Sequence, residues 1–264
     1  MKPVRIILFR EFESYFATPL AYVFIVIFLV LTGVCTFSFG ALFERGQADL
    51  APLFSLLPWL YLFLVPAISM RLWAEERKSG SIELLLTLPV TTWQAVLGKF
   101  LAAWIFLGIA LVLTFPSWIT INYLGNPDNG AVFAGYVGAF VMAGAYLAVG
   151  SCMSALTNNQ VIAFVVAAIV CFILTIAGLP AVTEWSRAFF DGISSWSLFG
   201  AAARDAVQTF GAALTDGIAG LSFLTHFTNI TKGVLALRDV LYFALVITFF
   251  LLASTALLEA RKSN

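Results

Sequence analysis

The chain has 264 residues, of which 61% are hydrophobic and only 11% are charged, and its mean hydropathy is +0.99. Apolar content at this level exceeds what a soluble core needs, and helices that cross a bilayer are the usual reason for it. The formal net charge is zero, with 14 Lys and Arg against 14 Asp and Glu, so the charge balance does not point to nucleic acid as a partner. The composition therefore predicts an all-α membrane protein that spans the bilayer several times.

The N-terminal residues 4–17 mix apolar side chains with charged ones. This mixture favours a helix that lies in the membrane interface, with its basic groups toward the headgroups. Arg5 and Arg10 ahead of an apolar run also resemble the start of a signal peptide, but Glu11 and Glu13 interrupt that pattern and the apolar run is too long for one. We therefore expect an uncleaved first span.

Six long apolar runs follow, each close to the roughly 20 residues that a helix needs to cross about 30 Å of hydrocarbon. Ionisable residues are confined to the ends of these runs, whereas carriers driven by an ion gradient usually place such residues at mid-membrane depth. A secondary carrier is therefore disfavoured. Small residues such as Gly144, Gly150 and Ser154 are expected to let helices pack closely. The predicted spans are residues 20–42, 52–70, 100–121, 132–156, 160–180 and 237–258.

The basic residues predict the orientation of the chain. Nine of the 14 Lys and Arg residues lie at the two termini or between residues 71 and 99, and the short first and third loops hold only Arg45. Because cytoplasmic loops are enriched in Lys and Arg, both termini and the second loop are expected in the cytoplasm. The turn at residues 157–160 is then cytoplasmic as well.

Residues 181–236 form the one long segment whose sequence is not typical of a membrane-spanning helix. Trp185, Phe189 and Ile193 recur at helical spacing, with charged residues off their stripe, so short amphipathic helices are expected. With six spans, this segment is expected on the extracytoplasmic side of the membrane. Its tryptophans suit the membrane boundary, so these helices are expected to dip into the outer leaflet or to cover the last span.

Motifs for catalysis are missing from the sequence. It contains no G-x-x-x-x-G-K-[ST] loop to cradle phosphates, so the chain alone is not expected to hydrolyse ATP. His226 is the only histidine, which excludes a multi-histidine metal site in one chain and favours a structural role. Cys35, Cys152 and Cys171 lie in apolar runs and are expected to pack there. No catalytic residue, metal site or bound cofactor is predicted.

The stretch RLWAEERKSGSIELLLTLPVTTW, residues 71–93, interrupts the apolar sequence with charges of both signs. Each charge would cost roughly 2.5 to 3.5 kcal/mol at the centre of an inserted helix, so the stretch must leave the membrane. Topology alone would need only basic residues, and the added carboxylates indicate a surface that faces another protein; an ordinary charged loop is the alternative. The charges at its start are Arg71, Glu75, Glu76, Arg77 and Lys78.

A short surface helix is expected within this stretch. Ile82, Leu85 and Leu86 make a small apolar stripe, and Pro89 closes it. Thr91 and Gln94 then have the spacing of a capping box, which predicts the start of the third membrane helix, with Lys99 near the headgroups.

Residues 74–90, AEERKSGSIELLLTLPV, resemble the motif A-E-E-[RK]-x-x-G-[ST]-[IL]-E-x-L-L-x-x-P-V of the permease subunits of type-2 ABC transporters, and LGKFLAA at 97–103 is similar to the same family. The stretches REFESYFATPLAYVF at 10–24 and HFTNITKGVLALRDVLYF at 226–243 are similar to the branch of gliding-motility permeases and relatives near nitrous-oxide-reductase maturation. The resemblance therefore runs over essentially the whole chain.

The resemblance implies six spans, an N-terminal interfacial (elbow) helix, and short extracytoplasmic helices before span six. It also implies a cytoplasmic coupling helix between spans two and three, seated in a groove of a separate ABC ATP-binding subunit that binds ATP and Mg. Two permease copies, identical or related, would pair with two such ATPases, and span two with the partner copy's span five would form the translocation wall. The residues that the resemblance assigns to the ATPase-facing module are Glu75, Glu76, Arg77, Gly80, Glu83, Leu85, Leu86 and Pro89.

The leading hypothesis is a non-catalytic permease subunit of an ATP-driven transporter, of export type, in the bacterial inner membrane. The alternative is a module that passes ATP-driven motion to an auxiliary periplasmic or membrane protein without transporting anything. Membrane lipid is the expected surrounding and nucleic acid is not an expected partner. The sequence does not identify a substrate.

Overall fold

The computed structural model describes residues 2–39, 46–78, 80, 90–194, 201–234 and 236–262. Within these ranges the chain forms helices joined by short turns, with no strand. The all-α prediction is confirmed.

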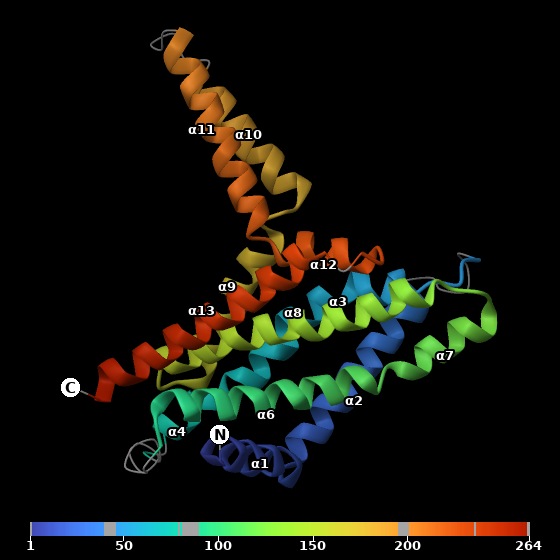
Figure 1. Ribbon diagram of the computed structural model, residues 1–264, viewed down its shortest axis with the longest axis vertical. Helices are drawn as coiled ribbons and strands as arrows, with labels where there is room; N and C mark the ends of the chain where they lie inside the picture. The colour runs from blue at the N-terminus through green and yellow to red at the C-terminus, as the bar shows by residue number, and fades with distance from the viewer. Residues whose placement is uncertain are drawn as a thin grey trace.

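The helices follow one another in chain order as Figure 1 shows. They are α1 (Lys2–Ala17), α2 (Pro19–Val34) with a π-helical continuation (Cys35–Phe39), α3 (Ala51–Ser69), α4 (Arg71–Lys78), α6 (Thr92–Val112), α7 (Phe115–Leu124), α8 (Asn129–Leu156), α9 (Gln160–Ile176), α10 (Pro180–Ser194), α11 (Ala201–Gly220), α12 (Phe223–Thr231) and α13 (Leu237–Lys262).

Five stretches of the described chain are long and apolar enough to cross a membrane, and a sixth is found if α9 and α10 are taken as one bent span. The axes of α9 and α10 differ by 76°. The 17 residues of α9 alone cover about 26 Å at 1.5 Å per residue, slightly less than the hydrocarbon thickness. The sequence prediction of a multi-pass membrane protein is confirmed, with five to six membrane-capable helices.

Helix α8 forms the centre of the bundle. It packs against α3, α6, α9, α12 and α13. Its small residues make this possible: a Cβ added at Gly135 would lie 2.5 Å from the Phe54 ring of α3, and one added at Gly144 would lie 2.8 Å from the Trp104 ring of α6. Close approach of helix backbones through small residues is typical of membrane bundles.

Two helix starts have identifiable polar partners. Asp128 caps α8, because its carboxylate accepts the N–H groups of Gly130 and Ala131 at 2.9 and 3.2 Å. Helix α6 begins at Thr92, where the Gln94 side chain accepts the N–H of Thr91 at 3.3 Å. The helix thus starts eight residues before the apolar run at 100–121 and carries Lys99 within it.

The bundle has two distinct ends (Figure 1). Helices α1 and α4 and the C-terminus of α13 lie at one of them, which we call the charged end after Glu11, Arg71, Glu75, Glu76 and Lys99. Helices α7 and α12 lie at the opposite end.

Helices α10 and α11 pair into a hairpin that projects from the bundle, which we call the arm (Figure 1). The two helices approach closely where the Phe190 ring covers Gly211, since a Cβ there would lie 2.5 Å from that ring. Ser186 and Thr215 share a hydrogen bond of 2.8 Å across the same seam. The helices of the arm are 15 and 20 residues long. Residues 181–236, where short amphipathic helices are expected, thus contribute two longer helices to the arm and, after them, the nine-residue α12.

Candidate functional site

A buried lysine joins three helices at the charged end. The Nζ of Lys99 on α6 lies 3.1 Å from a carboxylate oxygen of Glu11 on α1 and 2.8 Å from one of Glu76 on α4. The lysine side chain is only 3% exposed, and each carboxylate is 19% exposed. Its ammonium also lies 5.5 Å from the ring centroid of Trp73 on α4, within reach of a cation–π interaction. We call these four residues the Lys99 cluster.

Charge pairing within the cluster favours the ionised form of Glu11. A cation withdrawn from water needs paired carboxylates, and Lys99 has two of them. Burial of the Glu11 carboxylate would raise its pKa, but Lys99 and Arg10 more than offset this effect and hold the pKa below its usual value. Arg10 donates to the second Glu11 oxygen at 2.7 Å. Glu11 is therefore a carboxylate at neutral pH.

Helix α1 packs directly on α6. A Cβ at Gly98 would lie 2.9 Å from the Ile7 side chain and 3.2 Å from the carbonyl oxygen of Val4, so only glycine allows this separation. Further along the same contact, the rings of Tyr15 and Phe106 stack with centroids 5.2 Å apart. The helix expected in the membrane interface is thus fixed to a bundle helix along its length.

A serine of α8 bonds to the backbone where α3 ends and α4 begins. The Ser154 hydroxyl accepts the N–H groups of Trp73 and Ala74, both at 3.1 Å, and donates to the carbonyl of Met70 at 3.0 Å. The first N–H groups of a helix lack partners within it, and here a side chain from another helix supplies one. The Trp73 indole N–H also donates to Ser151 of α8 at 3.1 Å. Helix α4 is therefore fixed to the bundle centre as well as to α1 and α6.

The residues assigned to the ATPase-facing module divide into four groups. Glu76 belongs to the Lys99 cluster. Glu75 receives two hydrogen bonds from Arg71 one turn earlier, at 2.6 and 3.0 Å. Gly80 has a φ of +73° and donates to the carbonyl of Arg77 at 3.2 Å, a glycine ending typical of helices. Glu83, Leu85, Leu86 and Pro89 lie outside the described residues.

A cavity of about 480 Å³ separates α1 from α4 beside the Lys99 cluster. Arg10 and Ser14 line it from α1, and Arg71 and Glu75 line it from α4. Charged groups from two helices thus face one recess at the charged end.

The model of the family described as ABC-2 family transporter protein matches residues 52–262, about four fifths of the chain. The chain belongs to this family. Its members are membrane permease subunits that pair with an ABC ATP-binding subunit and are not themselves the ATPase. The match begins in α3 and includes α4, Lys99 and all later helices. A comparison with curated proteins gives no match.

The sequence predicted the family and a charged segment at residues 71–93. Its expected short helix, with Ile82, Leu85 and Leu86, lies outside the described residues, and α4 was not predicted as a helix. Nothing in the sequence indicated that Glu11, Lys99 and Ser154 belong to the site. Lys99 was expected near the headgroups, and Ser154 was expected only to let helices pack. Their partners lie 23 to 88 residues away along the chain, so no local spacing could reveal them.

Proposed function

We propose that the charged end of the bundle, with α1, α4 and the segment that follows α4, receives the ABC ATP-binding subunit. What supports this is the Lys99 cluster, because a single buried cation joins α1, α4 and α6. A displacement of α4 by the ATPase would then move these three helices together. Ser151 and Ser154 extend the connection to α8 at the bundle centre.

In this proposal the charged end is cytoplasmic and the bundle lies in the bacterial inner membrane. The clustering of Lys and Arg at the termini and around α4 supports that orientation. Two permease copies, identical or related, pair with two ATPases that bind ATP and Mg. Residues Glu83, Leu85, Leu86 and Pro89 complete the surface that contacts the ATPase, and the transported substrate moves outward.

The arm favours a second candidate function. It projects from the bundle and exposes large apolar side chains, with Trp185 and Phe189 on α10 and Phe210 on α11 between 53% and 69% exposed. An extended structure of this kind offers a lever that could act on an auxiliary protein without any solute crossing the membrane. Proteoliposomes containing both subunits distinguish the candidates: ATP-dependent movement of a solute favours transport, and ATP turnover without movement of any tested solute favours mechanical transmission.

The Arg71–Glu75 pair allows a test of the ATPase-facing role. Exchanging the two residues (Arg71→Glu with Glu75→Arg) keeps an i,i+4 ion pair on the helix but reverses the charges that face outward. We expect the exchanged variant to fold and to lose most co-purification with the ATPase and its ATP turnover. Glu184→Lys, a charge reversal on the exposed face of the arm, serves as the matched control and should leave both unchanged. Full binding and turnover in the exchanged variant would overturn the proposal.

A further inference from the structure

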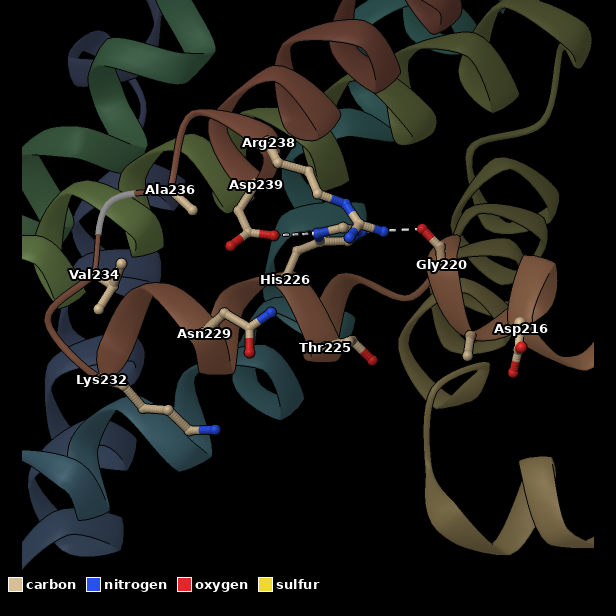
Figure 2. Close-up of a pocket in the computed structure, with 11 residues that line it drawn as sticks. Asp216, Gly220, Thr225, His226, Asn229, Lys232, Val234, Ala236, Arg238 and Asp239 are labelled. Carbon is tan, nitrogen blue, oxygen red and sulfur yellow. Dashed lines mark hydrogen bonds and ion pairs between the residues drawn. The ribbon is translucent and has the colours of Figure 1, made fainter.

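A buried histidine connects the arm to the last membrane helix. His226 of α12 is 6% exposed, and its Nδ1 lies 2.5 Å from a carboxylate oxygen of Asp239 on α13. Its Nε2 lies 2.9 Å from the carbonyl oxygen of Gly220, the last residue of α11 (Figure 2). The ring stacks on Tyr242 of α13 with centroids 3.9 Å apart. Three helices thus meet at one imidazole.

The hydrogen bonds of this imidazole require an additional proton. A carbonyl oxygen only accepts, so Nε2 must carry a hydrogen toward Gly220. A neutral ring then has a bare Nδ1, and the Asp239 carboxylate has no hydrogen to give it. Both bonds form only when the pair holds one proton more than a carboxylate and a neutral imidazole. Imidazole is the stronger base of the two in water, so we assign this proton to the ring.

The surroundings supply charges of both signs. Arg238 and Lys232 line the same cavity, of about 560 Å³, as His226 and Asp239 (Figure 2). Asp216 of α11 also lines it and pairs with Arg187 of α10 at 3.2 Å. Helices α3, α8 and α9, which pack on α12, contain no charged residue. Asp239 is therefore the carboxylate in direct contact with the ring, and the cavity gives water a route to the pair.

The position of the ring suits a cation. Gly220 ends α11, and the last carbonyl groups of a helix carry partial negative charge that favours a positive group. The same turn is held to α13 by the Tyr242 hydroxyl, which donates to the carbonyl of Leu221, and to α9 by Ser222, which donates to the carbonyl of Thr175 at 3.1 Å. Among the described residues, the imidazole thus joins the Tyr242 and Ser222 hydroxyls in holding the base of the arm, and its two bonds need the additional proton.

We propose that His226, Asp239 and their shared proton form a clasp that fixes the base of the arm to α13, and that loss of this proton as the pH rises releases the Gly220 carbonyl. Deprotonation leaves a lone pair facing an oxygen in one of the two bonds, so the contact between α11 and α13 through the imidazole is lost. The base of the arm is then held by fewer contacts, and the angle between the arm and the bundle becomes more variable. His226 is then a positioning residue that makes the arm's orientation depend on pH. The inference holds whether the arm serves transport or mechanical transmission.

Asp239→Asn is the variant that keeps the contact but removes the need for the additional proton. An asparagine amide can donate to Nδ1 while Nε2–H still donates to Gly220, so this variant keeps both bonds with a neutral ring. His226→Gln removes the ring and with it the simultaneous contact to Asp239 and Gly220. The two variants separate the need for a proton from the need for the contact.

Two measurements test the clasp on the full chain in nanodiscs. Because His226 is the only histidine, ¹⁵N-histidine labelling of a protein purified without a histidine tag reports on this ring alone. We expect both nitrogens protonated in the wild type at about pH 7, and a bare Nδ1 in Asp239→Asn. A bare ring nitrogen in the wild type at that pH would overturn the proposal.

The second measurement is the distance between spin labels placed at Ala212 on α11 and Tyr123 on α7, both exposed, by double electron–electron resonance. The wild-type distance distribution should be narrow near pH 6 and broaden toward about pH 10, where a histidine in water is neutral. Asp239→Asn should stay narrow throughout, and His226→Gln should be broad at every pH. A wild-type distribution that stays narrow at high pH would refute the proton dependence.

Discussion

Replacing Lys99 by methionine removes the cation that joins α1, α4 and α6 while keeping a long unbranched side chain. It leaves Glu11 and Glu76, each about four fifths buried, without their shared partner. Breaking a buried ion pair from one side typically costs about 3 to 5 kcal/mol. Glu11 keeps its bond to Arg10 and both carboxylates retain some contact with water, so we expect a loss at the lower end, about 3 kcal/mol.

The assay compares thermal unfolding of the purified variant with the wild type, together with amide hydrogen exchange in α1. We expect a lower unfolding midpoint and faster exchange in α1, because Glu11 no longer holds that helix to α6. The triple variant Glu11→Gln, Glu76→Gln, Lys99→Met removes all three charges and should recover most of the stability, since a neutral replacement leaves no buried charge unpaired. A Lys99→Met protein with wild-type midpoint and wild-type exchange in α1 would refute the structural role of the cluster.

Three further predictions concern the bundle. Ser154→Ala leaves two buried amides of α4 without their acceptor, so we expect the free energy of unfolding to fall by about 1 to 3 kcal/mol, measured by thermal unfolding. We also expect reduced ATP turnover of the complex. Unchanged turnover would show that this contact does not position α4 for the ATPase. Gly135→Ala places a Cβ 2.5 Å from the Phe54 ring and should lower the unfolding midpoint. The Cβ of Gly217→Ala, on the arm, meets nothing within 4 Å, so this variant should stabilise its helix by about 0.5 to 1 kcal/mol. Equal effects of the two variants would contradict the close packing of α8. The pKa of Glu11 is lowered in the folded chain, so its ion pair contributes stability at pH values above the unfolded pKa, and this stability is lost as the pH falls through the folded pKa. When the unfolding midpoint is measured as the pH is lowered, Glu11→Gln should lose less stability than the wild type. Identical acid profiles of the two proteins would contradict the pairing.

The positions of the bundle helices follow from patterns that are local in the sequence. Apolar runs of about 20 residues predict membrane helices because hydrocarbon offers the backbone no other hydrogen-bond partners. Asp128 and Gln94 act on N–H groups within three residues of themselves, so the starts of α8 and α6 are also local features. The charges at residues 71–78 predicted where the chain leaves the membrane, but not that these residues form the helix α4.

The Lys99 cluster could not be found in this way. A lysine at the start of an apolar run normally extends its ammonium to the headgroups, and that is the role the sequence suggests for Lys99. Its burial results from α1 folding back over α6, where Gly98 allows close approach and brings Glu11 to the ammonium. Such pairing depends on tertiary packing between helices far apart in the chain.

The pairing of the arm helices and the clasp at their base could not be predicted from local sequence patterns either. Charged and apolar residues alternate through residues 181–236, so the pattern predicts amphipathic helices but not how they pair or how far they extend. Gly211 permits the contact with Phe190 that closes the hairpin. The sequence shows His226 as a lone histidine, and only the fold brings Asp239, 13 residues later, to its ring.

The most direct test of the central claim is site-specific photo-crosslinking of the assembled complex in native membranes. A photoreactive amino acid is placed at Lys78, the exposed end of α4, and in a separate protein at Tyr123, which is 93% exposed on α7 at the opposite end. If the charged end receives the ABC ATP-binding subunit, position 78 crosslinks to that subunit and position 123 does not. Crosslinking of the ATPase at position 123, with none at position 78, would contradict the account.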